Sequence, residues 1–493
     1  MIQRPFPRTT PEAVGISSGD VQHLLDRLCS LPEGQEVHHF MLLRHGMVAA
    51  EGSFAPFRPD APHDLCSVSK AFTGTAVGFA VQEGLLDMDE PITEILPDKL
   101  PEELQPEMKQ ETIRVLLEMG AGQAAGDAHG GIKGTKRVKW APRRRQKNAG
   151  GDLAKEFFTT PILYEPGSVF GYNGMCSYLL GLAVTRRSGQ DLMEYLKPRL
   201  FDPLGIEMPF AERDELGVCL GQSGVSLSAE ELAALGWFYM QDGKWNGEQL
   251  LDADWVREAK KQHLPTKSQV GDDWSQGYCW QFWRGTHNTF RFCGAFGQMC
   301  VCVPDYDAIF VVESGADVAH MHDVLDCFYD TILGHFSGRP LPEDPTAAKN
   351  LRVRCANLAL SEPTGAMPAT AWMYNGHWSY KRACPVETVS IACEGDETRV
   401  KLVLRSGTTL SLRAGFRAPA VGLLYPARED GKPDEWSASA WFQDNNDLHL
   451  RARSIYSFSR MDLRFRLERE TLLMELNCRR MHLETKDTVW KSV

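Results

Sequence analysis

The chain has 493 residues, of which 43% are hydrophobic and 24% charged, and its formal net charge is -12. This length predicts two or three domains, and the acidic balance argues against nucleic acid or an anionic membrane as the main partner. No apolar run is long enough to cross a bilayer, and the first residues, MIQRPFPRTTPEAVG, lack the apolar stretch of a signal peptide. We therefore expect a cytoplasmic protein.

The 13 cysteines are scattered along the chain. Because an odd number cannot all pair, we expect reduced thiols that act as small core side chains. No Cys-x2-Cys pair is present to suggest zinc. The cluster His320-Met321-His322-Asp323 lacks a second group of ligands, so we expect these residues at the start of a helix and predict no metal site.

The first elements in chain order are two short strands over residues 38–53, which turn at His45-Gly46. Residues 68–85 then carry a helical pattern with apolar side chains nearly all round, which indicates a helix buried in the centre of a domain. Ser67 and Lys70 lie three residues apart at the start of this helix, so both side chains face the same way.

The Ser67–Lys70 pair has the composition of an activated nucleophile. An alcohol attacks a carbonyl poorly until a base takes its proton, and a lysine serves as that base when desolvation keeps its amine neutral. A motif that specifies only two residue types within four positions also occurs by chance in many chains of this length. The interpretation of this pair therefore depends on what other chemistry the chain carries.

Residues 124–151 interrupt the pattern with a basic segment. Eight lysines and arginines occur from Lys133 to Lys147, and no acidic residue lies between Ala128 and Gly151. We expect a solvated insertion. Two alternatives stay open at this point: a flap near a functional site, and a patch for nucleic acid or another anion.

Helices are predicted next at 153–158, 177–187 and 228–241, the last of which opens with the capping-box pattern Ser228-Ala229-Glu230-Glu231. Strands are predicted at 278–283, 291–292, 298–303 and 308–313. The order of a strand pair, a helical middle and a strand group predicts an α+β domain, in which one antiparallel sheet is flanked by helices and carries an inserted helical region.

A proline-rich stretch at 339–345 is a candidate linker. Beyond it, residues 400–404, 409–412, 448–452 and 461–467 alternate between apolar and polar, with turn signals between the segments and no long helix. We therefore expect a first domain over 1–340 and a small antiparallel, barrel-like β-domain over 341–493.

A second piece of chemistry lies at 165–174, Glu-Pro-Gly-Ser-Val-Phe-Gly-Tyr-Asn-Gly. A positive charge favours the phenolate of a nearby tyrosine, so Tyr172 beside a lysine is able to accept and return a proton. Taken alone, Tyr172 also fits a loop aromatic with its hydroxyl in water.

From about Thr9 to Ser337 the chain resembles the serine β-lactamase and penicillin-binding-protein superfamily, in its class C-like branch of esterases, D-amino peptidases and 6-aminohexanoate-oligomer hydrolases. Residues 65–73 are similar to the first motif, which implies Ser67 as nucleophile and Lys70 as base. Residues 166–173 resemble the second motif, which implies Tyr172 as the proton relay. Further similar segments occur in the family's order at 83–89, 224–233 and 242–251. The resemblance implies a β-lactamase/transpeptidase-like fold.

Two departures from the family pattern concern the substrate. The family often has asparagine two residues after the tyrosine, whereas this chain has Gly174 there and Asn173 beside the tyrosine. The third motif, Lys-Thr-Gly or His-x-Gly, would fall at Phe292-Cys293-Gly294-Ala295, where only the glycine is kept, and a register at Gly297-Gln298 is the alternative.

The resemblance implies an oxyanion hole formed by the backbone N–H groups of Ser67 and Ala295, with Gly294 and Asn173 also at the substrate. β-Lactams and peptidoglycan stems present a carboxylate that favours a cationic partner, whereas an ester or neutral amide needs none. We therefore expect a serine hydrolase that forms an acyl-enzyme with a small ester or amide or a short peptide, without cofactor, nucleic acid or membrane. The alternatives are a β-lactamase or penicillin-binding D-Ala peptidase, and a catalytically silent binding protein of the same fold.

Overall fold

The computed structural model describes residues 5–123, 151–267, 271–424, 434–443, 446–478 and 488–493. The contacts divide the chain into two units: the first comprises the chain up to Gly52 and Asp64–Ala356, and the second comprises Ser53–His63 and Asn357–Val493. The basic segment predicted as an insertion lies outside the described residues. Within the described ranges, no helix is long and apolar enough to cross a membrane.

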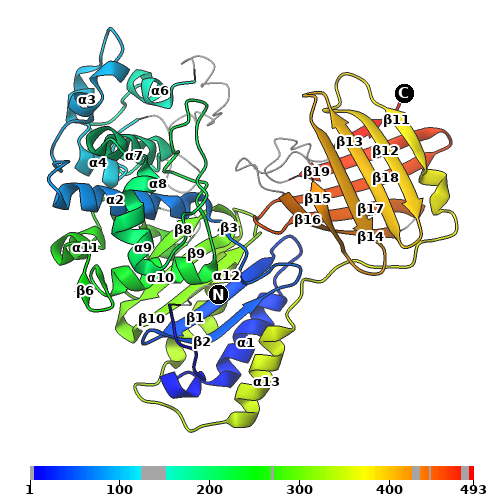
Figure 1. Cartoon of the computed structure of the whole chain (residues 1–493), viewed down its shortest axis with the longest axis horizontal. Helices are drawn as coiled ribbons and strands as arrows, with labels where there is room; N and C mark the ends of the chain where they lie inside the picture. Colours follow the sequence, from blue (N-terminus) through cyan, green and yellow to red (C-terminus); the bar gives the residue numbers. More distant parts are fainter. Residues whose placement is uncertain (1–4, 124–150, 268–270, 425–433, 444–445, 479–487) are drawn as a thin grey trace. The chain divides into compact units, whose positions relative to one another are not determined.

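The first unit is built on a six-stranded sheet with the order β2-β1-β10-β9-β8-β7 (Figure 1). Its strands are β1 (Val37–Arg44), β2 (Met47–Ser53), β7 (Trp283–Arg284), β8 (Phe290–Gly294), β9 (Gln298–Val303) and β10 (Ala308–Ser314). The antiparallel pairing of β1 with β10 joins the N-terminal hairpin to the late strands, as the element order predicts. His45 (φ 54°) and Gly46 (φ 69°) take the positive φ values that a tight hairpin turn between β1 and β2 requires.

Helices cover both faces of this sheet. Ile309 of β10 faces α10 (Ala229–Met240), where it lies beside Gly236. The next residue, Phe310, stacks on Phe328 of α12 (Met321–Thr331), with ring centroids 4.6 Å apart. Because neighbouring side chains of a strand point to opposite faces, the two helices lie on opposite sides. All residues of β1, β9 and β10 are buried accordingly.

The other α-helices described in the first unit are α1 (Ser18–Cys29), α2 (Ser69–Gln82), α3 (Ile92–Ile95), α4 (Ile113–Leu117), α6 (Leu153–Thr159), α7 (Gly174–Ser188), α8 (Leu192–Leu196), α9 (Asp202–Leu204), α11 (Ala253–Ala259) and α13 (Pro345–Ala356). The predicted buried helix is α2, in which every residue from Ser69 to Ala80 is buried. Gly74 and Gly78 allow neighbouring chain to approach it closely: a β-carbon at 74 would lie 3.2 Å from the carbonyl oxygen of Trp280, and one at 78 would lie 2.4 Å from the indole nitrogen of Trp255.

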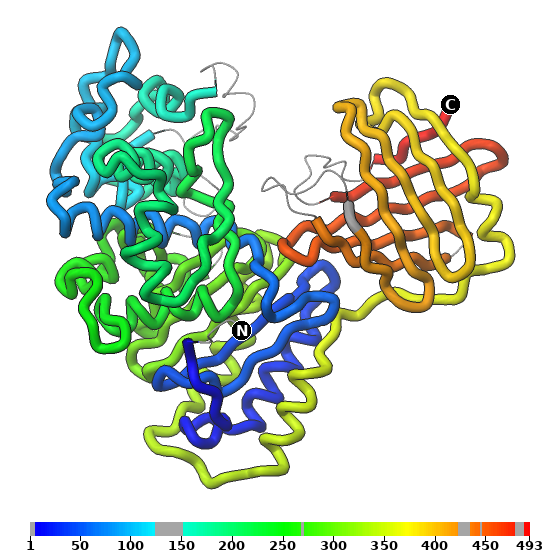
Figure 2. The backbone as a smooth tube through the Cα atoms, in the orientation of Figure 1, coloured from blue at the N-terminus to red at the C-terminus, as the bar shows by residue number. Residues whose placement is uncertain are grey.

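Two sequence predictions in this unit are wrong. Residues 278–282 do not form a strand, because the Cys279 N–H donates to the Phe282 carbonyl and Gln281 takes a φ of 73°, which makes a tight turn against α2. The region after 341 does contain a helix of three turns, α13, which belongs to the first unit and lies along α1 (Figures 1 and 2). There Arg354 of α13 pairs with Asp26 of α1 at 2.6 Å. The chain therefore leaves the first unit after Ala356 rather than at 341.

The second unit is a curled, mostly antiparallel sheet with the order β11-β12-β13-β14-β16-β17-β18-β19-β20 and β15 beside β16 (Figure 1). Its strands are β11 (Gly376–Ser379), β12 (Val386–Glu394), β13 (Glu397–Leu404), β14 (Thr409–Gly415), β15 (Ala420–Leu424), β16 (Asp434–Gln443), β17 (Asp447–Ser454), β18 (Arg460–Glu468), β19 (Thr471–Cys478) and β20 (Val489–Lys491). A bridge between Tyr380 and Ser492 brings the two ends of the sheet together. The predicted α+β class with a barrel-like β-domain is confirmed.

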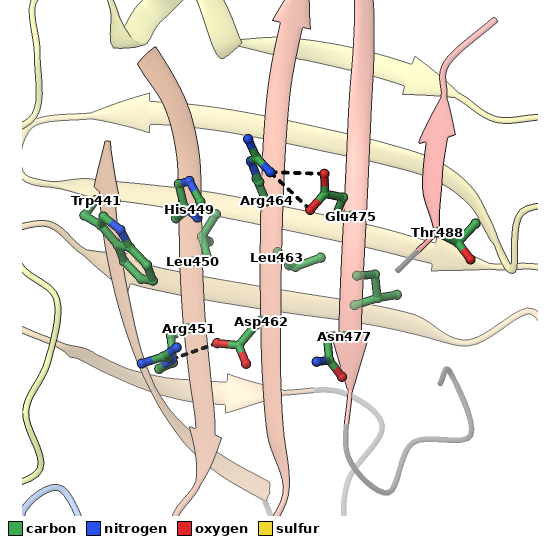
Figure 3. Close-up of a pocket in the computed structure, with 11 residues that line it drawn as sticks. Trp441, His449, Leu450, Arg451, Asp462, Leu463, Arg464, Glu475, Asn477 and Thr488 are labelled. Carbon is green, nitrogen blue, oxygen red and sulfur yellow. Dashed lines mark hydrogen bonds and ion pairs between the residues drawn. The ribbon is translucent and has the colours of Figure 1, made fainter. Parts of the chain in front are cut away.

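Along β17, apolar side chains that face the core of this second unit alternate with polar side chains that face the other way. Leu448 and Leu450 are buried in the core, whereas His449 and Arg451 are only partly buried and line a cavity of about 320 Å³. In this cavity Arg451 pairs with Asp462 and Arg464 pairs with Glu475, so its charges balance (Figure 3).

Candidate active site

Ser67 lies in the short 3-10 turn η2 (Cys66–Val68) that leads directly into α2. Several main-chain contacts hold this turn. The Leu65 N–H donates to the Val225 carbonyl at 2.9 Å, and the Cys66 N–H donates to Oδ1 of Asp64 at 2.8 Å. Cys66 has a φ of 49°, a strained conformation for a residue with a side chain. The turn presents Ser67 partly exposed at the end of a buried helix.

The side chain of Ser69 also stabilises this turn. Its hydroxyl donates to the Cys66 carbonyl at 2.6 Å and accepts the Val225 N–H at 3.0 Å, and the residue is buried. One side chain thereby satisfies two main-chain groups, the Cys66 carbonyl and the Val225 N–H, as buried polar groups require. The position of Ser67 is therefore set by the chain around it and not by the helix alone.

Lys70 is buried, and its Nζ lies 2.9 Å from Oγ of Ser67 and 2.8 Å from the carbonyl oxygen of Gln222. A carbonyl oxygen only accepts, so an N–H of Lys70 points at Gln222. When the amine is neutral, its lone pair is then available to the Ser67 hydroxyl proton. This is the arrangement that a serine activated by an adjacent base requires.

Tyr172 lies beside the same amine, with its ring centroid 4.9 Å from Nζ of Lys70. Its ring stacks on Trp283 at 5.6 Å and meets Tyr278 edge-on at 6.1 Å, and all three rings are buried. Such packing fixes the orientation of an aromatic side chain. The structure thus brings Ser67, Lys70 and Tyr172 together. Their catalytic roles stay predictions.

The end of β8 approaches the nucleophile turn from the other side. A β-carbon on Gly294 would lie 2.2 Å from the Leu65 carbonyl oxygen and 3.1 Å from Cβ of Cys66. Gly297, in contrast, abuts Ser314, and the Gln298 side chain bonds the Ser314 backbone at 2.6 and 3.1 Å. The register in which Gly294, followed by Ala295, borders the site is therefore the one present. The Ala295 N–H as an oxyanion donor stays a prediction.

The cation expected of the third motif is missing from this edge. Within β8 the one basic residue is Arg291, which is fully buried. Its guanidinium pairs with Asp273 and lies 4.4 Å from the Trp274 ring. Arg291 is therefore part of the core beside the site and is not available to a substrate carboxylate.

The structure shows Asn173 as the capping residue of α7, and its predicted substrate contact stays a prediction. Its side-chain oxygen accepts the Met175 N–H at 3.0 Å, which caps α7, and its amide nitrogen donates to Gln123 at 3.1 Å. The residue is buried. Both polar atoms of this side chain are thus engaged by the protein itself.

Sequence reasoning missed Gln222, which contacts Lys70 through a main-chain carbonyl. No side-chain pattern marks a carbonyl acceptor, so no sequence signal pointed to it. None of the 13 cysteines forms a disulfide in the structure, and most are buried. Burial, and secondarily Glu111, raises the pKa of the Cys176 thiol well above its usual range, which makes this nearby cysteine a core group and not a competing nucleophile.

Comparison with known proteins identifies the family. The profile of the Beta-lactamase family matches residues 36–320. A 6-aminohexanoate-dimer hydrolase from Paenarthrobacter ureafaciens is 26% identical over 249 residues, which is 50% of this chain and 60% of that protein. A lovastatin esterase from Penicillium rubens is 30% identical over 151 residues, 29% of this chain and 37% of that protein. The chain thus matches less than two thirds of the length of either curated relative.

Solved structures show the same fold. A Bacillus anthracis protein provisionally named a 6-aminohexanoate-dimer hydrolase aligns with a TM-score of 0.52 at 19% identity, over 66% of this chain and 85% of that one. A penicillin-binding-protein homologue from Caulobacter crescentus aligns with a TM-score of 0.50 at 16% identity, over 64% of this chain and 97% of that one. With the family profile spanning residues 36–320, this chain belongs to the Beta-lactamase family.

Proposed function

We propose that this protein is a serine hydrolase that forms an acyl-enzyme with an ester or neutral amide of a small molecule or short peptide. The observation that carries the proposal is the 2.9 Å contact between Nζ of the buried Lys70 and Oγ of the partly exposed Ser67. A base must lie within hydrogen-bond reach of the proton it takes, and Lys70 meets that condition. The curated relatives named as an amide-type and an ester-type hydrolase support the same reaction class.

In the proposed reaction, the Ser67 proton passes to Nζ of Lys70 as Oγ forms a bond to the substrate carbonyl carbon. The negative charge that develops on the carbonyl oxygen is held by backbone N–H donors. The bond to the leaving alcohol or amine then breaks, and that group takes the proton from Lys70 by way of Tyr172. Water attacks the acyl-enzyme ester in the same manner, which releases the acid and restores Ser67.

The lack of an available cation on β8 favours an ester or neutral amide over a β-lactam. A carboxylate on the substrate gains most from a charge-assisted contact, and Arg291 is committed to Asp273. β-Lactamase or D-Ala peptidase activity is the second candidate, supported by the family match. A silent binding protein is disfavoured because Ser67, Lys70 and Tyr172 are all present and adjacent.

The test is intact-mass labelling of the full chain with a fluorophosphonate and with a penicillin, together with hydrolysis of a panel of esters and amides. We expect one Ser67-dependent fluorophosphonate adduct, turnover of at least one ester or amide, and loss of both in Ser67→Ala. No adduct and no turnover would contradict the hydrolase proposal. A long-lived penicillin adduct on Ser67 would favour the penicillin-binding role instead.

A further inference from the structure

The segment Gly221-Gln222 accepts hydrogen bonds from side chains on two successive turns of α2. The Gln222 carbonyl accepts a hydrogen bond from Lys70 at 2.8 Å, and the Gly221 carbonyl accepts one from Oγ1 of Thr73 at 2.6 Å. Lys70 and Thr73 are three residues apart and so lie on one face of the helix. The carbonyl that orients the amine of Lys70 is therefore held in place by a second bond one residue away.

The side chain of Gln222 extends toward the chain that carries Tyr172. A β-carbon on Gly174, two residues after Tyr172, would lie 2.6 Å from Oε1 of Gln222 and 3.2 Å from its Cδ. Gln222 is 5% exposed, and its buried Oε1 has no hydrogen-bond partner in the part of the chain that the structure describes. A buried acceptor without a hydrogen-bond partner lowers the stability of the folded protein. The presence of this amide oxygen therefore needs an explanation other than its contribution to stability.

Gly174 itself has no conformational reason to be glycine. It is the first residue of α7, and its φ is not among the positive values of the chain. Alanine is the stronger helix former at such a position. The one obstacle within 3.0 Å of a side chain at 174 is the amide oxygen of Gln222, so the glycine is explained by the space that this amide occupies.

We propose that Gln222 is a positioning residue of the active site: its main-chain carbonyl orients Lys70 while its side-chain amide, packed against Gly174, sets the spacing between Lys70 and the Tyr172 segment. This inference rests on the proposed hydrolase function. Gln222 contacts the amine of Lys70 through its main-chain carbonyl at 2.8 Å and takes no proton itself in the proposed reaction. It acts through the base on one side and through the segment of the relay tyrosine on the other.

The test is a double-mutant cycle with Gly174→Ala, Gln222→Ala and the pair combined, assayed as full-length protein for kcat and KM on p-nitrophenyl butyrate. Gly174→Ala is expected to lower kcat about ten-fold with KM within about two-fold, since misplacing a catalytic group acts on the chemical step. In the Gln222→Ala background the same substitution is expected to change kcat by less than about two-fold, because the obstructing amide is gone. Gly334→Ala, where an added β-carbon meets nothing within 4 Å, is the matched control.

Equal effects of Gly174→Ala in both backgrounds, or wild-type kcat in Gly174→Ala, would overturn the role of Gln222. Thermal unfolding of each variant supplies a separate measure of the same coupling, so that a destabilised variant still tests the contact. If the wild-type chain shows no Ser67-dependent hydrolysis, the proposed function fails. If it hydrolyses the ester while the two substitutions prove independent, only the inference about Gln222 fails.

Discussion

Gly294 lies so close to Leu65 that a β-carbon on the glycine would stand 2.2 Å from the leucine carbonyl oxygen. This contact joins the end of β8 to the residue that precedes the nucleophile turn, although more than two hundred positions separate them in the sequence. Backbone lies against backbone here, so neither side has a flexible side chain that could yield. The close approach of β8 to the nucleophile turn therefore depends on a glycine at position 294.

Gly294→Ala tests that contact. The methyl group must push β8 away from η2, so we expect kcat/KM to fall by at least about 100-fold and the free energy of unfolding to fall by about 1–3 kcal/mol. Ester hydrolysis and chemical denaturation measure the two effects. Gly338→Ala is the control, since an added β-carbon there meets nothing within 4 Å. Wild-type activity in Gly294→Ala would show that β8 does not border the reacting atoms.

Lys70→Met removes the proposed base and keeps the length of the side chain. We expect kcat to fall by about 10²- to 10⁴-fold. Stability should be kept or rise, because a buried amine is replaced by an apolar group. Steady-state kinetics and thermal unfolding measure the two effects, with the exposed Lys244→Met as control. A folded Lys70→Met protein with unchanged kcat would rule out Lys70 as the base.

Tyr172→Phe removes the side-chain hydroxyl and keeps the aromatic ring. The phenyl ring retains the stack on Trp283 at 5.6 Å, so folding should be unchanged, while loss of the relay hydroxyl should lower kcat by about 100-fold. Stopped-flow measurement of acylation and deacylation shows which step is affected. Tyr456→Phe, in the second unit, is the matched control. If Tyr172→Phe hydrolyses esters as fast as wild type, proton return does not pass through this phenol.

Glu111→Gln is expected to stabilise the protein at neutral pH. Glu111 is fully buried, its carboxylate oxygens have no hydrogen-bond partner among the described residues, and burial raises the pKa of its carboxyl well above the usual range. The unfolded chain releases this proton near pH 4.5, whereas the folded protein keeps it. Stability from this group is therefore complete below about pH 4.5 and falls as pH rises toward the folded pKa, by about 1.4 kcal/mol per pH unit.

Thermal unfolding from pH 4 to pH 8 measures this dependence. The melting temperature of Glu111→Gln should decline less than that of wild type above pH 5, and the exposed Glu107→Gln should follow wild type. Parallel curves for Glu111→Gln and wild type would show that the Glu111 carboxyl titrates normally in the folded protein.

Much of the fold follows from local pattern. The hairpin at His45-Gly46, the helix α10 with its Ser228–Glu231 capping box, and strands β9 and β10 occur where the sequence predicts them. Each depends on residues a few positions apart. The run 278–283 was predicted wrongly because its aromatic composition is typical of strands, whereas it forms a turn that packs against Gly74 of α2.

The pairing of Ser67 with Lys70 is also a local matter, since three residues make nearly one helical turn and bring both side chains to one face. Residues from distant parts of the chain meet at that pair only through tertiary packing. Gln222 contacts Lys70 across 152 positions by a main-chain oxygen, which no side-chain identity encodes. The choice of Gly294 over Gly297 and the capping role of Asn173 likewise depend on which backbone lies within reach, and spacing along a chain does not specify that.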